Sequence, residues 1–192
     1  MLSQKLKNYS IILGSGSPRR QQFFKDLDLD FIIQVKSVDE VYPSHLQGAE
    51  ITDYLADLKS KAFTNLKENE LVITSDTIVW LENKPLEKAS NEQEAFEMLQ
   101  KMSGKMHEVI TSVSIKSANF HKLFNDTTRV FFKELSNDEI LFYIKNYQPF
   151  DKAGAYGIQE WIGFIGIEKI EGSYFNVMGL PVHKLYEELM KL

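Results

Sequence analysis

Apolar and polar positions along the chain follow two alternating periods, which predict strands interleaved with helices. Strands are predicted where apolar residues form short runs or alternate with polar ones, at residues 10–14, 31–35, 71–74, 78–81, 107–117 and 127–132. Helices are predicted where apolar residues recur every three or four positions, at residues 18–26, 49–66, 90–102, 136–144 and from 181 onward. With no internal repeat and no linker-like stretch, this order predicts one α/β domain over residues 1–192.

Local signals mark where several of these helices begin. The Ser-Pro pair at residues 17–18 combines a good N-cap with a proline at the first helical position. Ser90 with Gln93, and Ser136 with Glu139, have the spacing of a capping box. Each of the three helices is therefore expected to start at its serine.

Composition narrows the functional classes. No run of 18 apolar residues is present, so no membrane span and no membrane partner are expected. The chain has no cysteine, which excludes disulfides, zinc–thiolate sites and cysteine nucleophiles. The first predicted strand follows only nine residues after the start of the sequence, so no signal peptide is expected. A net charge of −5 argues against a nucleic-acid partner, so cations for any polyanionic ligand must be gathered locally.

The segment Gly-Ser-Gly-Ser-Pro-Arg-Arg at residues 14–20 has the character of a phosphate cradle. It joins a strand to a helix N-terminus, where open backbone N–H groups and the helix dipole favour an anion. Ser15 adds a hydroxyl, and Arg19 and Arg20 add planar guanidinium forks that suit phosphate oxygens. Neither known glycine-rich phosphate motif is matched, and a capped surface helix with solvated arginines explains the residues about as well.

Asp76 follows an apolar strand, at the strand end where ligands of open α/β sheets bind. Its carboxylate could hold Mg²⁺ or orient an attacking water, although Asp is also common in turns. Glu40, in the loop after the second strand, is a candidate second metal ligand, with the neighbouring Asp39 as a competitor.

Further candidates are single residues whose default role is structural. Lys61 and Lys84 could meet phosphates, but either could be an ordinary surface lysine. Gln159, in the glycine-rich stretch 154–179, is an amide that could read a base edge. His107 opens a strand and is interpreted as structural.

Taken in order, the motifs resemble the Maf family of nucleoside triphosphate pyrophosphatases. The opening segment 14–20 is similar to the family's A-S-x-S-P-R-R signature, and Ser-Asp-Thr-Ile-Val at 75–79 is similar to its A-D-T-x-V. Matching blocks follow at 84–85, 98–111, 151–159 and 172–181, so the resemblance covers nearly the whole chain.

The resemblance implies an α/β fold of the Maf/ITPase-like type: a mixed twisted sheet flanked by helices, with a cleft between two lobes. It implies a cytoplasmic enzyme, often a homodimer, that uses a divalent metal such as Mg²⁺ or Mn²⁺ to split the α–β phosphate bond. The family's proton acceptor falls on Asp76, and its specificity-linked positions on Arg19, Thr77 and Gln159. Its other cleft residues fall on Ser15, Arg20, Glu40, Lys61 and Lys84.

The block at residues 153–159 is similar to the subgroup that acts on dTTP and UTP. Two departures stand out: Gly14 replaces a usual alanine, and Glu160-Trp161 stands where the family usually has glycine.

The expected reaction is attack of water on the α-phosphorus, with pyrophosphate leaving and with Asp76 and Glu40 holding the metal. The alternative is a nucleotide-binding regulator of cell division that does not cleave its ligand.

Overall fold

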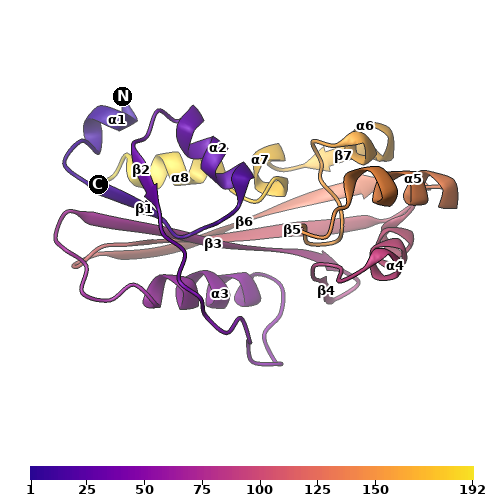
Figure 1. Ribbon diagram of the computed structural model, residues 1–192, viewed down its shortest axis with the longest axis horizontal. Helices are drawn as coiled ribbons and strands as arrows, with labels where there is room; N and C mark the ends of the chain where they lie inside the picture. The colour runs from indigo at the N-terminus through magenta and orange to yellow at the C-terminus, as the bar shows by residue number, and fades with distance from the viewer. The chain divides into compact units, whose positions relative to one another are not determined.

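The computed structural model describes residues 1–192 and contains seven strands in one sheet (Figure 1). The strands are β1 (Ser10–Leu13), β2 (Phe31–Ile33), β3 (Glu70–Leu81), β4 (Lys84–Leu86), β5 (Met106–Lys116), β6 (His121–Phe132) and β7 (Ile167–Glu171). Their order is β2-β1-β3-β5-β6-β7, with β4 paired to β3. Parallel and antiparallel pairs both occur, which confirms the predicted mixed α/β sheet.

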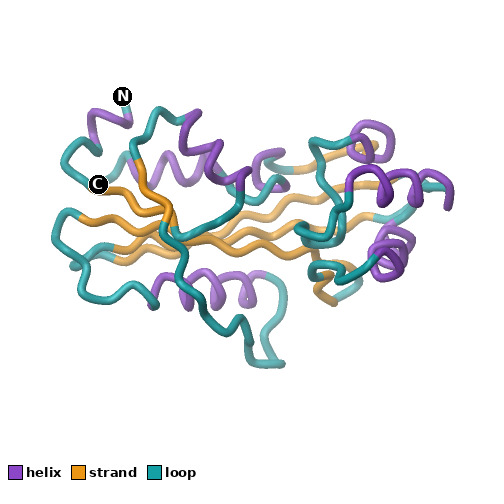
Figure 2. The backbone as a smooth tube through the Cα atoms, viewed as in Figure 1, coloured by secondary structure: helices purple, strands orange, loops and turns teal.

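Helices connect the strands and flank the sheet (Figure 2). They are α1 (Leu2–Lys5), α2 (Pro18–Asp26), α3 (Ala49–Lys61), α4 (Glu92–Met102), α5 (Asn137–Tyr147), α6 (Trp161–Gly166), α7 (Tyr174–Val177) and α8 (Val182–Leu189). None of them combines the length and the apolar character that crossing a bilayer requires.

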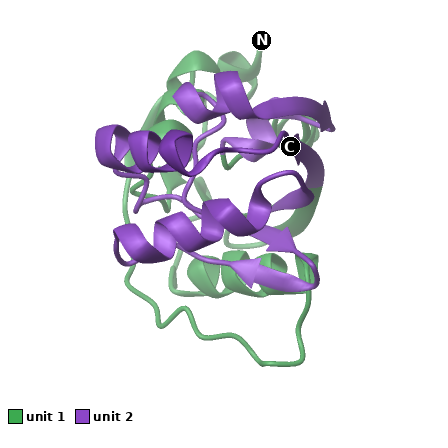
Figure 3. Cartoon of the chain, turned by 90° about the vertical axis from the view of Figure 1, so that its right-hand side faces the viewer, with its two compact units in different colours: residues 1–76, 111–126, 179–192 green, residues 77–110, 127–178 purple.

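The chain divides into two compact units (Figure 3). The first comprises residues 1–76, 111–126 and 179–192, and the second comprises residues 77–110 and 127–178. In the first unit β1 pairs in parallel with both β2 and β3, and the carboxyl ends of β1 and β2 lie level with Ile73, beyond which β3 continues. Helix α3 covers one face of this part of the sheet, while α2 and α8 cover the other (Figures 1 and 2).

The second unit is built on antiparallel pairs, β3 with β4 and β6 with β7. Helix α4 packs against α5, and α5 packs against α6. Its core is a single cluster of buried side chains from these helices and strands, in which Leu99, Ile140, Tyr143 and Ile162 are almost fully excluded from solvent.

Two strand predictions need correction. The runs 71–74 and 78–81 form one continuous strand, β3, because residues 75–77 keep the extended conformation that their polar side chains disguised. Strand β6 begins at His121, six residues before the predicted start. Its first six residues place two apolar side chains next to each other, Leu123 and Phe124, between polar pairs, so no apolar alternation marks that part. The His121 ring bonds across to Ser114 on β5 at 3.0 Å.

Helix ends were predicted with mixed success. The capping box of Ser136 and Glu139 is confirmed. The box assigned to Ser90 and Gln93 is wrong by one residue, because Asn91 is the N-cap and its side chain accepts from the Glu94 N–H at 3.0 Å.

Helix α3 ends at Lys61, five residues before the predicted end. The Lys116 ammonium, on β5, donates to the carbonyls of Ser60 and Phe63 at 3.3 and 3.0 Å. These carbonyls at the helix end therefore have a partner outside the helix.

His107 lies in the core of the second unit, in agreement with its structural interpretation. It is 1 % exposed, and its Nε2 lies 2.8 Å from the Tyr156 hydroxyl. The rings of Phe132 and Tyr156 pack edge-on against the imidazole. Burial lowers the pKa of His107 from 6.5 to about 4, because the charged form would lose its hydration.

We therefore expect acid to destabilise the protein through His107. The unfolded chain takes up a proton near pH 6.5 and the folded chain near pH 4, so stability is complete above the first value and falls as pH drops toward the second. The free energy of unfolding should fall by on the order of 3 kcal/mol over this range. Urea titrations at a series of pH values from 7 to 4 should show this decrease, and the free energy of unfolding should depend much less on pH in His107→Gln. An unchanged pH dependence in that variant would assign the acid sensitivity to other groups.

Candidate active site

The predicted cradle begins where β1 ends. Leu13 of β1 is level with Ile73 of β3, and the Gly14 N–H continues the pairing with the Ile73 carbonyl at 2.8 Å. The loop 14–17 therefore runs beside residues 74–76. The amino end of α2 and the acid on β3 thus belong to one edge of the first unit's sheet, as the phosphate-cradle hypothesis requires.

The half-buried Arg20 side chain, on the first turn of α2, ties this edge together. Its Nη1 donates to the Ser75 carbonyl at 3.1 Å and to the Ser15 hydroxyl at 3.3 Å, and its Nε donates to the Gly179 carbonyl at 2.8 Å. Burial lowers the pKa of Arg20 to about 10, which leaves the guanidinium charged at neutral pH. The side chain thus fixes the loop to β3 and to the start of the C-terminal segment.

Gly14 is closely packed against β3. A Cβ at this position would lie 2.7 Å from Thr74 Cγ2 and 3.3 Å from the Phe63 ring. Thr74 has little freedom to move, because its hydroxyl donates to the Ala56 carbonyl at 2.7 Å in a buried position. The threonine methyl group therefore fills the space that an alanine methyl would occupy, which explains why glycine is suited to this chain.

A lysine joins the two predicted carboxylates. Lys59 Nζ, on the last turn of α3, lies 2.7 Å from Asp76 Oδ1 and 2.7 Å from Glu40 Oε2. Asp76 is 8 % exposed, whereas the Glu40 side chain is 54 % exposed. Of the two adjacent acids in the loop, Glu40 rather than Asp39 makes this contact.

Opposing effects act on the pKa of Asp76, and the net direction is upward. Burial raises the pKa of its carboxyl above the ordinary value, while the ammonium of Lys59 and the guanidinium of Arg20 act in the opposite direction. Glu40 adds to the increase, because a second negative charge nearby disfavours ionisation. A partly desolvated carboxylate that faces cations is the kind of group that acid–base chemistry uses.

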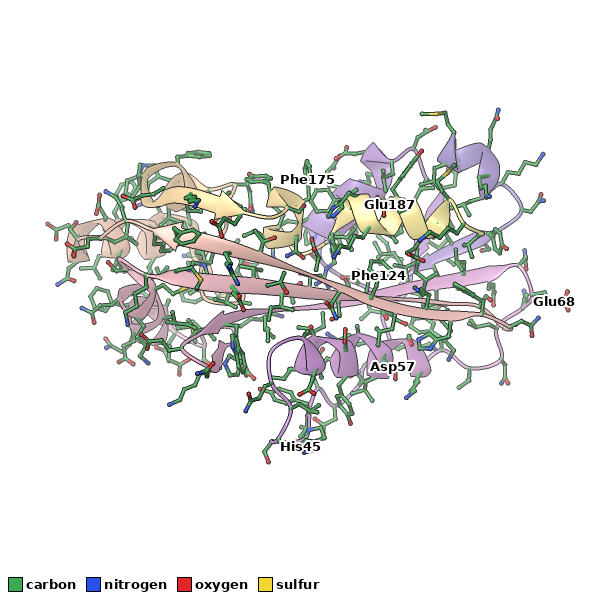
Figure 4. All side chains as sticks on the ribbon, turned by 180° about the vertical axis from the view of Figure 1, so that it is seen from behind. His45, Asp57, Glu68, Phe124, Phe175 and Glu187 are labelled. Atoms are coloured by element: carbon green, nitrogen blue, oxygen red, sulfur yellow. The ribbon has the colours of Figure 1, made fainter.

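Four of the predicted residues in the first unit are brought together: Ser15, Arg20, Glu40 and Asp76. Arg19 is half-buried beside Arg20. Lys61 is placed elsewhere: its exposed Nζ forms an i,i+4 ion pair with Asp57 of α3 at 2.6 Å. Figure 4 labels Asp57 on this helix. The lysine that contacts the acids is Lys59, two residues earlier.

The sequence did contain a signal for Lys59. A stripe of apolar residues alone would place Tyr54 on the buried face of α3, but this side chain is exposed. The actual stripe contains polar Thr52 and Ser60, because the Thr52 hydroxyl bonds to Ser112 at 2.6 Å and the Ser60 hydroxyl to the Asp57 carbonyl at 2.9 Å. Including such small hydroxyl residues rotates the stripe and puts Lys59 at its edge.

The remaining predicted residues belong to the second unit. Thr77 is half-buried and follows Asp76 directly on β3, and Lys84 is exposed at the start of β4. Gln159 lies in a turn before α6, and its Oε1 is buried with no hydrogen-bond partner in the protein. A buried acceptor without a donor is costly, which makes this amide a candidate for ligand contact.

The donor set fits a hard divalent cation. The carboxylates of Asp76 and Glu40 already converge on one positive charge, the Lys59 ammonium. Mg²⁺ is commonly held by one or two carboxylates together with substrate phosphates. No group of three or more acidic, histidine or cysteine side chains gathers in the chain, so a metal would need ligands from the substrate or water.

Comparison with known proteins identifies the family of this chain. The family model described as Maf-like protein matches residues 10–192. The chain belongs to the Maf family. Curated relatives include proteins of Flavobacterium johnsoniae (60 % identical, 100 % of both chains), Christiangramia forsetii (57 %, 100 % of this chain and 98 % of the relative) and Bacteroides fragilis (50 %, 97 % and 98 %). Each of these Maf-family relatives carries the name dTTP/UTP pyrophosphatase.

Among solved structures, a HAM1 protein from Coxiella burnetii is similar to this Maf chain with a TM-score of 0.52. The match covers 96 % of this chain and 100 % of the other, at 15 % sequence identity. At that identity it shows a shared fold.

The packing of Gly14 leads to a prediction that runs against the family's usual alanine. Gly14→Ala should lower the free energy of unfolding by about 1–3 kcal/mol, the typical cost of overpacking. Adding Thr74→Ser removes the clashing Cγ2 and keeps the hydroxyl, so the double variant should recover most of the stability that Gly14→Ala loses. A urea-denaturation double-mutant cycle measures the coupling. Strictly additive effects would mean that Thr74 does not set the requirement for glycine.

Proposed function

We propose that this Maf-family chain hydrolyses dTTP and UTP at the bond between the α- and β-phosphates, releasing a nucleoside monophosphate and pyrophosphate. The names of its full-length relatives support this activity. The observation that carries the proposal is the bridge from Lys59 to Asp76 and Glu40, on the same sheet edge as the arginine-bearing start of α2.

In the proposed reaction, a water oxygen attacks the α-phosphorus and the bond to the bridging oxygen breaks, so pyrophosphate leaves. Asp76 takes the proton from the water, since its carboxylate is both desolvated and held in place. Lys59 and Arg19 offset negative charge on the phosphate oxygens, which is the main catalytic demand of phosphoryl chemistry.

Arg20 has a different role from the one that the family motif implies. Its guanidinium donates to two backbone carbonyls and one hydroxyl of the protein, so we assign it to holding the loop 14–17 against β3. Ser15 serves the same loop, because its hydroxyl oxygen also accepts from the Ser17 N–H at 3.3 Å. Both residues then act on the substrate by positioning backbone N–H groups at the start of α2.

Asp76 and Glu40 would hold the divalent cation, Mg²⁺ or Mn²⁺, that the family resemblance implies. When bound, such a cation supplies Lewis-acid stabilisation of phosphate oxygens and promotes ionisation of water. For the second unit, phosphate contact by Lys84 and base selection by Thr77 and Gln159 stay predictions from the family resemblance. A cytoplasmic location and a homodimer remain predictions from the family resemblance.

Lys59 and Lys61 provide a matched test of the charge bridge. Lys59→Met should lower kcat/KM for dTTP by roughly 10²–10³, the usual effect of removing a stabilising charge from a phosphate site. Lys61→Met, two residues away, should stay within about twofold, because its ammonium is exposed and paired only with Asp57. Circular dichroism and a thermal scan would verify that both variants fold. Equal losses in the two variants would remove Lys59 from the mechanism.

The reaction itself is tested by identifying both products from dTTP, UTP, dCTP, CTP, dATP and dGTP with Mg²⁺ or Mn²⁺. We expect monophosphate and pyrophosphate, fastest from dTTP and UTP, and a loss of roughly 10²–10⁴ in rate in Asp76→Asn. Nucleotide binding without any pyrophosphate would favour the regulator alternative. Faster hydrolysis of purine nucleotides would contradict the substrate assignment.

A further inference from the structure

The residue after Gln159 is a glutamate where the family usually has glycine, and this glutamate belongs to a tight turn. The Glu160 N–H donates to the Gly157 carbonyl at 3.0 Å, which closes a four-residue turn with Ile158 and Gln159 at its centre. Helix α6 starts directly afterwards, with Glu160 as its N-cap. The position of the Gln159 side chain is therefore set by how firmly Gly157 and Glu160 are held.

One hydroxyl group holds both corners of this turn. Tyr143, on α5, is fully buried, and its hydroxyl oxygen accepts from the Gly157 N–H at 3.0 Å. The same hydroxyl donates to Glu160 Oε2 in a short hydrogen bond. Tyr143 uses its donor and its acceptor capacity on opposite ends of one turn, which fixes the turn to the core of the second unit.

The other carboxylate oxygen of Glu160 is also held. Lys152 Nζ lies 3.1 Å from Glu160 Oε1 and 2.7 Å from Asp151 Oδ1. The Lys152 side chain is 10 % exposed and the Glu160 side chain 19 %. Both charges are largely removed from water, so each needs the other, and the glutamate has little freedom to take another rotamer.

Gly157 is packed directly beneath these side chains. A Cβ there would lie 2.8 Å from Glu160 Cδ and 3.1 Å from Gln159 Nε2. The carboxylate of Glu160 and the amide of Gln159 thus lie side by side over the glycine. A displacement of Glu160 would release space into which the Gln159 amide could turn.

We propose that Tyr143, Glu160 and Lys152 form a hydrogen-bonded clamp on the turn 157–160 that presents the Gln159 amide to a pyrimidine base, which makes Glu160 a specificity-determining positioning residue. This inference rests on the proposed function, because it takes Gln159 as the group that reads the base. The clamp itself is defined by contacts within the second unit alone.

The chemistry of the bases explains why a fixed amide discriminates. Uracil and thymine carry an N3–H donor, whereas cytosine has an unprotonated acceptor nitrogen at that position. The buried Oε1 of Gln159 has no donor in the protein. It accepts a hydrogen bond from N3–H of uracil or thymine, whereas in cytosine it would face the lone pair of N3. A site with a fixed, buried polar group rejects an analogue that leaves the group unpaired. If the amide can rotate, it can present its NH₂ group instead, and the discrimination falls.

The test compares Tyr143→Phe and Glu160→Gln with Tyr147→Phe as the matched control. Tyr147 lies on the same helix, and its ring stacks on Tyr143 at 5.1 Å, but its hydroxyl is not part of the clamp. Titration calorimetry of the full-length protein with dTMP and with dCMP gives the ratio of the two dissociation constants. Amide hydrogen exchange at Gly157 reports the state of the turn without any ligand.

We expect the preference for dTMP over dCMP to fall at least about tenfold in both clamp variants, because the fixed polar group that distinguishes the bases is lost. The preference should persist in the control. Exchange at Gly157 should rise about fivefold or more in Tyr143→Phe, the effect of losing one hydrogen bond. Glu160→Asp, which keeps the charge, should retain part of the preference. A clamp with only a structural role would lower the thermal midpoint and leave the ratio unchanged.

Three outcomes would overturn the inference: an unchanged ratio in both clamp variants, unchanged exchange at Gly157 in Tyr143→Phe, or equal binding of dTMP and dCMP by the wild type. The proposed function fails separately, if the wild type releases no pyrophosphate from dTTP or UTP. Binding and exchange do not depend on turnover, so the two failures can be told apart.

Discussion

The candidate site depends on one electrostatic constraint: a lysine ammonium that lies between a buried and an exposed carboxylate. Asp76 is carried on a strand in the interior, where an isolated negative charge would be strongly disfavoured. Lys59 makes the charged form tolerable, and Glu40 is brought in from a loop by the same cation. Without Lys59, the pKa of Asp76 would rise further, which disfavours the carboxylate form that holding a cation or accepting a proton requires.

Much of the fold could be predicted from the sequence because burial follows simple periods. The apolar runs gave β1 and both ends of β3, and the Ser136–Glu139 pair gave the start of α5 correctly. Predictions failed where polar residues occupy regular structure. Residues 75–77 were left outside the predicted strands and the first half of β6 was missed, since neither stretch shows an alternating apolar pattern.

The candidate site was likewise predicted only in part. Motif spacing identified Ser15, Arg20 and Asp76, which lie on one edge of the sheet. The family resemblance gave Lys61 as a cleft residue, whereas the lysine that contacts Asp76 and Glu40 is Lys59, on the same helix as the buried hydroxyl residues Thr52 and Ser60. The role of Arg20 as a tie between segments depends on the carbonyls of Ser75 and Gly179. No residue type in the sequence reveals such backbone partners.

The capping of α3 by Lys116 has a further consequence for Lys59. A lysine side chain has about 2 kcal/mol of rotamer entropy to lose when its ammonium is fixed. Lys116 on β5 binds the Ser60 carbonyl on the last turn of α3 and the Phe63 carbonyl just after it, which holds the backbone next to Lys59 in place. The charge bridge is therefore largely organised before a ligand arrives, and less of the binding energy of a nucleotide is consumed in ordering the protein.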